Sequence, residues 1–175
     1  MDAVAQLKAK IRDVPDFPKK GINFKDITTL LKDGPAFQLA IETLAERLRP
    51  YPVDVVVGME SRGFIFAAPI AYLLGVGFVP VRKIGKLPTE AVSVQYDLEY
   101  GAATLEMHVD GVGSGQRVLV VDDLLATGGT VCATIELVEK LGGSVSAAAF
   151  LVELDFLQGR ARLQDYNVIS LIHYP

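Results

Sequence analysis

The sequence predicts an α/β fold, a central mainly parallel sheet flanked by helices. Apolar runs of strand length alternate with longer segments of helical periodicity. These apolar runs are continuous, which is typical of parallel strands buried on both faces. Polar clusters follow three of the runs, at the strand ends where open α/β sheets bind their ligands. The three clusters therefore predict one ligand pocket.

The N-terminal part predicts two helices. Apolar residues at helical spacing mark the first, and the proline and glycine of 16–21 end it. The apolar residues are Val4, Leu7 and Ile11. The second helix follows Pro35 and runs through 36–49.

Strands and helices then alternate along the chain. The predicted strands are 53–59, 76–81, 117–123, 144–154 and 167–174, and the predicted helices are 63–75 and 129–143. Gly142 is expected to end the second of these helices. The polar, turn-rich stretch between Arg82 and Arg117 breaks the alternation, and we interpret it as a mobile loop flanked by a small antiparallel element.

Composition restricts the class of protein. A chain of 175 residues, half of them apolar, suits one domain with one core. A net charge of −4 argues against a general nucleic-acid binder. A single cysteine, Cys132, fits a reducing compartment, and no apolar run approaches the roughly 20 residues that span a bilayer. We therefore expect a cytoplasmic protein that binds neither membrane nor nucleic acid.

The stretch VLVVDDLLATGGT, residues 118–130, combines an acidic pair with a loop suited to phosphate. ATGGT follows a strand and opens a helix, whose N-terminal N–H groups attract anions. The predicted phosphate ligands are Ala126, Thr127, Gly128, Gly129 and Thr130. The loop matches neither the P-loop nor the dinucleotide fingerprint, so an ordinary helix N-cap remains the alternative.

A phosphoribosyl group would satisfy both halves of this stretch. Its 5-phosphate would lie on the amides of 126–130, and its 2- and 3-hydroxyls would donate to Asp122 and Asp123. Carboxylates also stabilise positive charge that develops on the ribose when the C1 bond breaks. They can organise a magnesium ion directly or through water. A turn with solvated charges is the alternative.

The same stretch resembles the signature of the type I phosphoribosyltransferases. DFPKKGINFKDIT, GMESRGFIFAAPIA, GFVPVRKIGKLP and YDLEYG extend the resemblance over nearly the whole chain and narrow it to the adenine phosphoribosyltransferases. Lys25 and Ile84 are mild departures from the family pattern. The resemblance implies the type I phosphoribosyltransferase fold in a single domain, 1–175, with a small base-binding hood at about 1–34 and a flexible catalytic loop at about 84–103.

The implied reaction belongs to purine salvage. It transfers the 5-phosphoribosyl group from phosphoribosyl diphosphate to adenine and gives AMP and diphosphate. Mg²⁺ is the implied cofactor, held mainly through the substrate and near Asp122 and Asp123, and a homodimer is the implied assembly. Whether basic residues of the site act across the dimer interface stays open at the level of the sequence.

The resemblance also assigns residues to each ligand. Diphosphate binding falls to Glu60, Ser61, Arg62, Arg82, Lys83 and Lys86. A cis peptide bond is implied at Glu60–Ser61. Adenine binding falls to Asn23, Phe24, Lys25 and Leu124, with Phe24 and Leu124 on the two ring faces and main-chain atoms of Asn23 and Lys25 reading the base edge.

Glu99 is the implied acid/base for the purine N7 proton, in a loop that closes over the site with the help of Tyr100. Cys132 is interpreted as core, and His108 and His173 receive no role. Two other functions stay open. One is a different base on the same scaffold: hypoxanthine, guanine, uracil or orotate. The other is a non-catalytic regulator that senses phosphoribosyl diphosphate.

Overall fold

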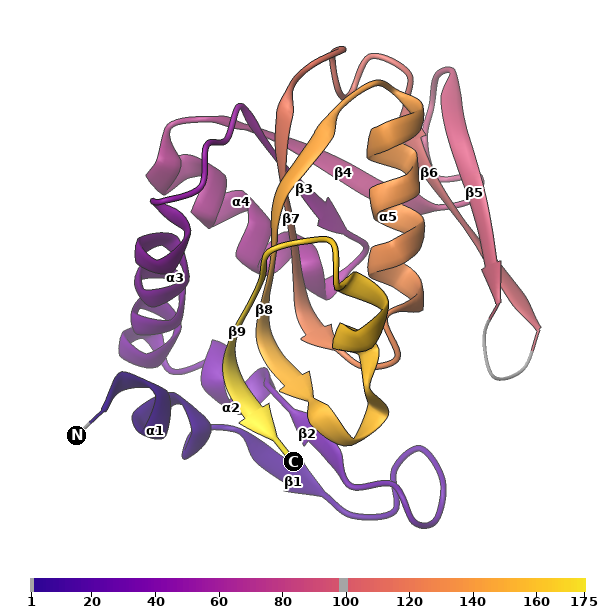
Figure 1. Ribbon diagram of the computed structural model, residues 1–175. Coiled ribbons are helices and arrows are strands. Elements are labelled where there is room, and N and C mark those ends of the chain that lie inside the picture. Colours follow the sequence, from indigo (N-terminus) through magenta and orange to yellow (C-terminus); the bar gives the residue numbers. More distant parts are fainter. Residues whose placement is uncertain (1, 98–100) are drawn as a thin grey trace. The chain divides into compact units, whose positions relative to one another are not determined.

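A computed structural model describes residues 2–97 and 101–175 of the chain (Figure 1). The chain divides into two compact units, Met1–Thr43 and Leu44–Pro175. Within the described residues, no helix is both long enough and apolar enough to cross a membrane.

The first unit holds two short helices and a hairpin. Its elements are α1 (Ala3–Lys8), β1 (Arg12–Val14), β2 (Phe24–Asp26), α2 (Thr28–Leu31) and the start of α3 (Gly34–Leu48). The first predicted helix is shorter than its apolar spacing indicates, because Ile11 lies beyond α1. β1 and β2 pair antiparallel, and Arg12 donates to Asp26 across them. That hydrogen bond lowers the pKa of Asp26 to about 2.

The second unit is built on a seven-stranded sheet with the order β5-β6-β4-β3-β7-β8-β9. β3 (Val55–Met59), β4 (Gly77–Lys83), β7 (Arg117–Leu125), β8 (Ser144–Leu154) and β9 (Val168–Tyr174) run parallel. All residues of β3 and seven consecutive residues of β8 are buried, which explains why these strands are continuous apolar runs. The five predicted parallel strands are confirmed, with ends shifted by no more than two residues.

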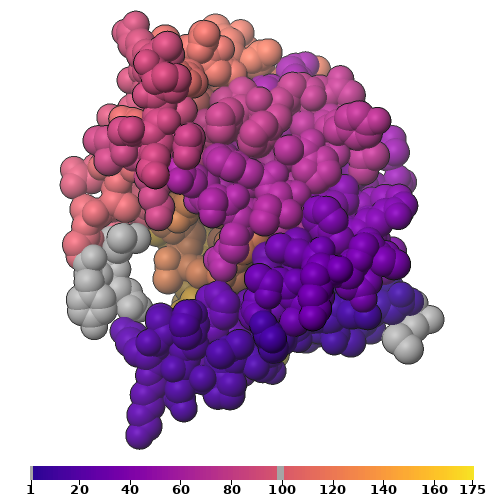
Figure 2. Space-filling view, turned by 180° about the vertical axis from the view of Figure 1, so that it is seen from behind, coloured from indigo at the N-terminus to yellow at the C-terminus, as the bar shows by residue number. Residues whose placement is uncertain are grey.

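Two helices cover the sheet on opposite faces. α5 (Gly129–Lys140) packs against alternate residues of the strands, among them Val57 and Val120. α4 (Arg62–Leu74) lies on the other face (Figure 1), where a Cβ atom on Gly58 would be 2.6 Å from Ala67. α4 also contributes to the outer surface seen in Figure 2. Gly142, with φ +84°, directly follows the end of α5, as predicted for a helix-ending glycine.

The polar stretch after Arg82 contains a β-hairpin. β5 (Ala91–Asp97) pairs antiparallel with β6 (Ala102–His108), and β6 pairs antiparallel with the end of β4. The predicted small antiparallel element is thus a hairpin that extends the parallel sheet at one edge. After β8, two 3₁₀ helices, η1 (Asp155–Leu157) and η2 (Gly159–Leu163), lead to β9.

Candidate active site

The acidic pair and the phosphate-type loop lie at the carboxyl end of β7. β7 was expected to end at residue 123, but it continues to Leu125 because β8 supplies pairing partners, Val152 and Glu153, for its last residues. Asp122 and Asp123 are therefore held by the sheet. The chain then turns through 126–128, and Gly128 adopts φ +84° as the cap of α5.

The loop encloses a small cavity of about 60 Å³. Its walls are Asp122, Leu124, Leu125, Ala126, Thr127, Gly128, Gly129, Thr130 and Val131. All five predicted phosphate ligands are in this wall, next to one of the two predicted ribose ligands. A helix N-terminus at such a wall presents unpaired N–H groups and a partial positive charge to an anion.

The two carboxylates lie in different surroundings. Asp123 is only 5% exposed, and its Oδ2 is 2.8 Å from Nε of Arg62, the first residue of α4. Asp122 accepts a hydrogen bond of 2.8 Å from the backbone N–H of Asp123. Gly63 lets α4 approach β7 closely at Asp122, because a Cβ atom at this position would lie 2.8 Å from Oδ1 of Asp122.

Desolvation disfavours the ionised form of both carboxyl groups. Desolvation raises the pKa of Asp122 well above its ordinary value, and the neighbouring charge of Asp123 raises it further. Desolvation also raises the pKa of Asp123, although Arg62 opposes that effect. The buried Asp123 and the half-buried Asp122 thus lie near one guanidinium, that of Arg62, and a ligand that brings hydroxyl donors or positive charge would stabilise them.

A basic cluster follows β3 and β4. The Glu60 carboxylate accepts hydrogen bonds from Nε of Arg82 at 3.3 Å and from the backbone N–H of Lys83 at 3.1 Å. Arg82 also donates to the carbonyl of Lys86. The Glu60–Ser61 peptide bond is cis, as the family resemblance implies. Since its side chain is occupied by Arg82, Glu60 could contribute to diphosphate binding only through its main chain.

The residues predicted to bind the base occur in both units, which are described separately. In the first, Asn23 precedes β2, and the ring of Phe24 meets Phe17 edge-on with centroids 5.2 Å apart. Lys25 pairs with Asp13 at 2.5 Å, so its side chain has a partner within the hairpin. In the second unit, Leu124 is half-buried in β7. Glu99 and Tyr100 lie outside the described residues.

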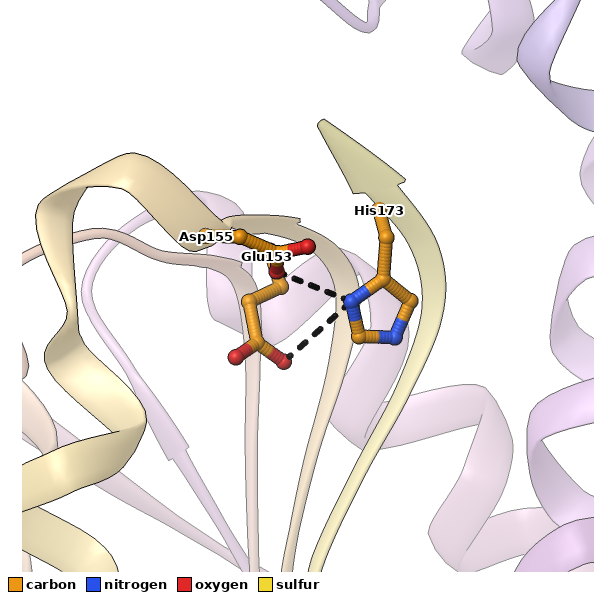
Figure 3. A group of neighbouring side chains, drawn as sticks. All are labelled: Glu153, Asp155 and His173. Atoms are coloured by element: carbon orange, nitrogen blue, oxygen red, sulfur yellow. Dashed lines mark hydrogen bonds and ion pairs between the residues drawn. The ribbon is translucent and has the colours of Figure 1, made fainter. Parts of the chain in front are cut away.

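A third group of titratable side chains lies at the carboxyl ends of β8 and β9 (Figure 3). Donor atoms of Glu153, Asp155 and His173 lie within 4.8 Å of one another, a spacing that could hold a metal ion. Nδ1 of His173 is 2.9 Å from Asp155 and 3.8 Å from Glu153. His173 has no predicted role, because it lies far along the chain from Glu153 and Asp155 and no local pattern indicates the group.

Two residues at the loop were missed from the sequence. The hydroxyl of Tyr96, in β5, is 3.3 Å from Oγ1 of Thr130, and its ring is where a Cβ atom on Gly129 would point, at 3.3 Å. The alternation of Val94 and Tyr96 in the hairpin indicates that Tyr96 faces the core, but it does not indicate that Tyr96 contacts the phosphate-type loop. Gly63 was missed because a glycine that opens a helix has no distinctive pattern.

Comparison with known proteins points to one family. The family model of the phosphoribosyl transferase domain matches residues 28–172. Adenine phosphoribosyltransferase of Desulfitobacterium hafniense is 58% identical over 164 residues, 94% of this chain and 95% of the relative. The crystal structure of the enzyme from Thermoanaerobacter pseudethanolicus superposes with a TM-score of 0.95 at 57% identity, covering 98% of this chain and 99% of the other. The Saccharomyces cerevisiae enzyme, crystallised with an imino-altritol bisphosphate and adenine, gives a TM-score of 0.91 at 40% identity over 97% and 98% of the chains.

Proposed function

Since the chain belongs to the adenine phosphoribosyltransferases, which transfer the phosphoribosyl group of phosphoribosyl diphosphate to adenine, we propose which of its residues carry that transfer. The chain is a pentosyltransferase that forms AMP and diphosphate for purine salvage. One observation carries our assignment: an acidic pair, with Asp123 buried and Asp122 half-buried, and an anion-type loop lie at the end of the same strand, β7.

The loop holds the 5-phosphate, and the acidic pair holds the ribose. The N–H groups of 126–130 donate to phosphate oxygens. Thr127 and Thr130 belong to the same loop, and their hydroxyls add further donors. Asp122 and Asp123 accept from the 2- and 3-hydroxyls. As the bond from C1 to diphosphate breaks, the carboxylates stabilise the positive charge that grows on the ribose ring.

Arg62 links the ribose site to the leaving group. A guanidinium has five N–H donors in a planar fork, so one that gives Nε–H to Asp123 can also donate to diphosphate oxygens. Main-chain groups of Glu60 and Ser61 and the cations of Arg82, Lys83 and Lys86 complete the diphosphate site. Their positive charge stabilises diphosphate as it leaves.

The donor set also fits Mg²⁺. Carboxylate oxygens are the protein ligands that this ion prefers, and it keeps several waters while it binds through substrate phosphates. Asp122 and Asp123 would hold it directly or through water, because two adjacent carboxylates near one guanidinium leave negative charge for a cation to neutralise. When bound, Mg²⁺ neutralises diphosphate charge.

A closing loop would exclude water from the reacting ribose. By the family resemblance we assign this to the segment at about 84–103, with Glu99 handling the N7 proton and Tyr100 seating the closed form. Exclusion matters because water competes with adenine for the ribose carbon. The contact of Tyr96 with Thr130 supports a link between this segment and the phosphate loop.

Adenine is identified by its hydrogen-bonding edge. It presents an exocyclic amine donor beside the N1 acceptor, whereas hypoxanthine presents a carbonyl beside an N1–H donor. Main-chain groups of Asn23 and Lys25 can distinguish these edges, since each residue offers a fixed donor and acceptor. The family resemblance assigns one ring face to Phe24 and, separately, the other to Leu124.

A substrate panel tests this function. With Mg²⁺ and phosphoribosyl diphosphate, adenine should be preferred over hypoxanthine by about 10⁴–10⁵ in kcat/KM, because the wrong base leaves buried polar groups unpaired. Lys25→Ala should keep this preference, and Phe24→Ala should damage it. Comparable rates with hypoxanthine, guanine, uracil or orotate would reassign the base, and no transfer to any base would favour the regulator.

We also assign a homodimer in the cytoplasm. Ile65, Tyr72 and Leu73 are exposed apolar side chains of α4, and Tyr72 is 84% exposed. Large apolar side chains gathered on one helix mark association surfaces, and α4 forms part of the face in Figure 2. Basic residues of the diphosphate site could then reach a neighbouring subunit.

A further inference from the structure

The backbone at the start of η2 lies directly against the phosphate loop. Gly159 is buried, and a Cβ atom on it would overlap the carbonyl oxygen of Ala126 and lie 3.0 Å from the backbone nitrogen of Gly128. In the other direction, a Cβ atom on Gly128 would lie 2.9 Å from the carbonyl oxygen of Gly159. Two stretches of main chain therefore touch with no side chain between them.

This contact has consequences for phosphate binding. The N–H groups of 126–130 can bind a phosphate only if they converge, and their direction depends on the backbone of the turn. The sheet fixes the turn on one side through β7, and α5 fixes its end. Gly159 is the wall on the remaining side, so a small displacement of Gly159 would change the direction of the amides.

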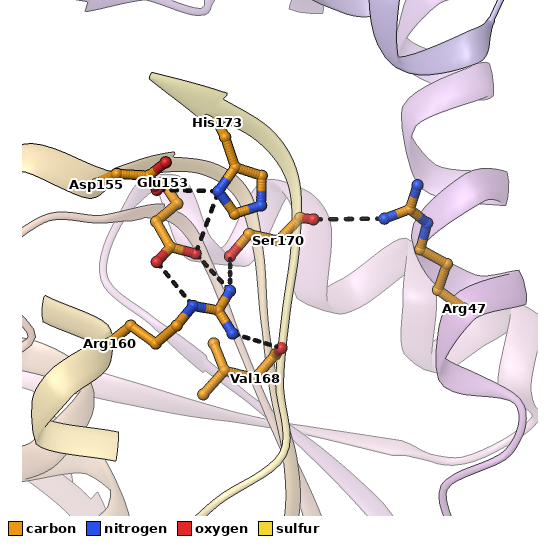
Figure 4. A network of polar contacts seen from close by, with 7 residues as sticks. All are labelled: Arg47, Glu153, Asp155, Arg160, Val168, Ser170 and His173. Atoms are coloured by element: carbon orange, nitrogen blue, oxygen red, sulfur yellow. Dashed lines mark hydrogen bonds and ion pairs between the residues drawn. The ribbon is translucent and has the colours of Figure 1, made fainter. Parts of the chain in front are cut away.

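Arg160 anchors this wall to the sheet (Figure 4). Its Nε donates to one oxygen of Glu153 at 2.9 Å, and a terminal nitrogen donates to the other at 2.5 Å. The guanidinium also donates to the carbonyl of Val168 at 3.0 Å and to Oγ of Ser170 at 3.4 Å. One side chain thus ties the residue next to Gly159 to both β8 and β9.

The anchor is stronger than an ordinary surface ion pair. Glu153 is only 4% exposed. Burial alone would raise its pKa, but hydrogen bonds from Arg160 and Ser170 outweigh it and hold the pKa below the usual value. A bidentate guanidinium on a buried carboxylate fixes both distance and orientation, which a single lysine contact cannot do.

We propose that Gly159 and the Arg160–Glu153 pair are positioning residues that set the shape of the 5-phosphate cradle. The inference rests on the proposed assignment of the 5-phosphate to residues 126–130. Gly159 contacts the cradle, and Arg160 acts through Gly159 without touching the substrate. The ion pair is therefore part of phosphoribosyl binding although it belongs to a different loop.

The same carboxylate belongs to the group that a metal ion could occupy. Arg160 donates to both oxygens of Glu153, so a cation there would compete with a guanidinium already in place. Of the three donors, only Asp155 and His173 lie outside the fork. We therefore assign Glu153 to Arg160.

The test separates binding at the 5-phosphate from binding at the diphosphate. Arg160→Met keeps most of the side-chain length and removes the fork, Arg160→Lys keeps the charge, and Gly159→Ala changes the wall itself. Each full-length variant is titrated with ribose 5-phosphate and with diphosphate by calorimetry. KM for phosphoribosyl diphosphate, KM for adenine and kcat are measured alongside.

A second ion pair provides the control. Arg117 donates to both oxygens of Asp54 at 2.9 and 2.6 Å, and it is 50% exposed against 44% for Arg160. It lies at the amino end of β7, away from the loop. Arg117→Met therefore removes a fork of the same type without touching the cradle.

We expect Arg160→Met and Gly159→Ala to weaken ribose 5-phosphate and raise KM for phosphoribosyl diphosphate roughly tenfold to 10²-fold, the effect of a misplacement of up to about 1 Å. Diphosphate affinity and KM for adenine should stay within about twofold, Arg160→Lys should fall between, and Arg117→Met should match the parent.

The inference is overturned if Arg160→Met and Gly159→Ala bind ribose 5-phosphate as the parent does, or if Arg117→Met weakens it equally. Failure of the proposed function is a different result: the parent itself would not bind ribose 5-phosphate. Should Arg160→Met not fold, Arg160→Lys and Gly159→Ala decide the question by the same measurements.

Discussion

The two ends of β7 use charged residues in opposite ways. At its amino end, Arg117 and Asp54 form a fork, and Asp54 also accepts from the backbone N–H of Arg117. Charges there are balanced one for one and partly exposed. At its carboxyl end, the buried Asp123 pairs with Arg62, and the adjacent, half-buried Asp122 lies near the same guanidinium. The same strand thus starts in a balanced ion pair and ends in an excess of acid.

This difference between the two ends of β7 distinguishes a carboxylate that supports the fold from one that is expected to bind a ligand. Burial lowers the stability of an ionised carboxylate, so an acid that only supports the fold is paired or left in water. Asp54 follows this rule, since the hydrogen bonds from Arg117 hold its pKa well below the usual range. Asp122 departs from it, since its pKa is raised by burial and by Asp123. An uncompensated cost of this kind is expected where a ligand completes the site.

The largest test of this comparison is to neutralise the acidic pair. The double variant Asp122→Asn and Asp123→Asn should lower kcat by roughly 10²–10³, the usual loss for a preorganised electrostatic contact. Its Tm should be kept or raised, because the amides remove buried negative charge. Steady-state kinetics at saturating substrate and calorimetric unfolding check both parts.

Asp54→Asn is the matched control for that experiment. It should lower Tm and leave kcat unchanged. Near-native turnover in the double variant would contradict the ribose and charge-stabilising role of the pair.

The next test removes the shared guanidinium. Arg62→Ala should weaken diphosphate by roughly tenfold to 10²-fold, since a hydrogen bond to a charged group contributes about 1.5–3 kcal/mol. Adenine affinity should change much less. Titration of both ligands measures this, with Arg49→Ala as a control because Arg49 pairs with the exposed Glu46. Equal diphosphate binding by the variant and the parent would remove Arg62 from the diphosphate site.

A smaller effect is expected from crowding the acidic pair. Gly63→Ala places a Cβ atom 2.8 Å from Oδ1 of Asp122 and 3.1 Å from the carbonyl oxygen of Val121, so helix or strand must shift. Such overpacking costs about 1–3 kcal/mol, and displacement of Asp122 should lower kcat by up to about 10²-fold. Gly77→Ala, where the added atom makes an ordinary 3.8 Å contact, is the control. Unchanged Tm and kcat in Gly63→Ala would show that the acidic pair tolerates the shift.

The features that a short stretch of sequence determines, such as buried strands and turns that open helices, could be predicted. The buried strands were predictable because two covered faces require continuous apolar residues, as in β3 and β8. The phosphate loop was predictable because ATGGT combines a turn and a helix start in five residues. The hairpin of β5 and β6 was only partly predictable, because its strands have an exposed side and carry polar residues there.

Contacts between distant segments could not be predicted. Nothing near Asp123 indicates its ion pair with Arg62, sixty-one positions earlier. The approach of Gly159 to Ala126 depends on how η2 leaves β8, and the extension of β7 to Leu125 depends on where β8 ends. The phosphate and ribose ligands were inferred from the stretch 118–130 itself, whereas the adenine and diphosphate ligands and the role of Glu99 came from the family resemblance; all of them stay proposals.

The smallest effect concerns the balanced end of β7 and has a defined pH dependence. The folded pKa of Asp54 lies below its ordinary value of 3.8 because Arg117 donates to the charged carboxylate. A lowered pKa means that the ion pair stabilises the fold above pH 3.8 and that this stabilisation disappears as pH falls toward the folded pKa. Asp54→Asn should therefore lower Tm by about 2–4 °C at neutral pH, and the difference from the parent should shrink below pH 3.8. Unfolding scans from pH 7 to pH 2 measure the gap directly. A gap that stayed constant across this range would mean that Asp54 acts through packing, and the contrast between the two ends of β7 would lose its electrostatic basis.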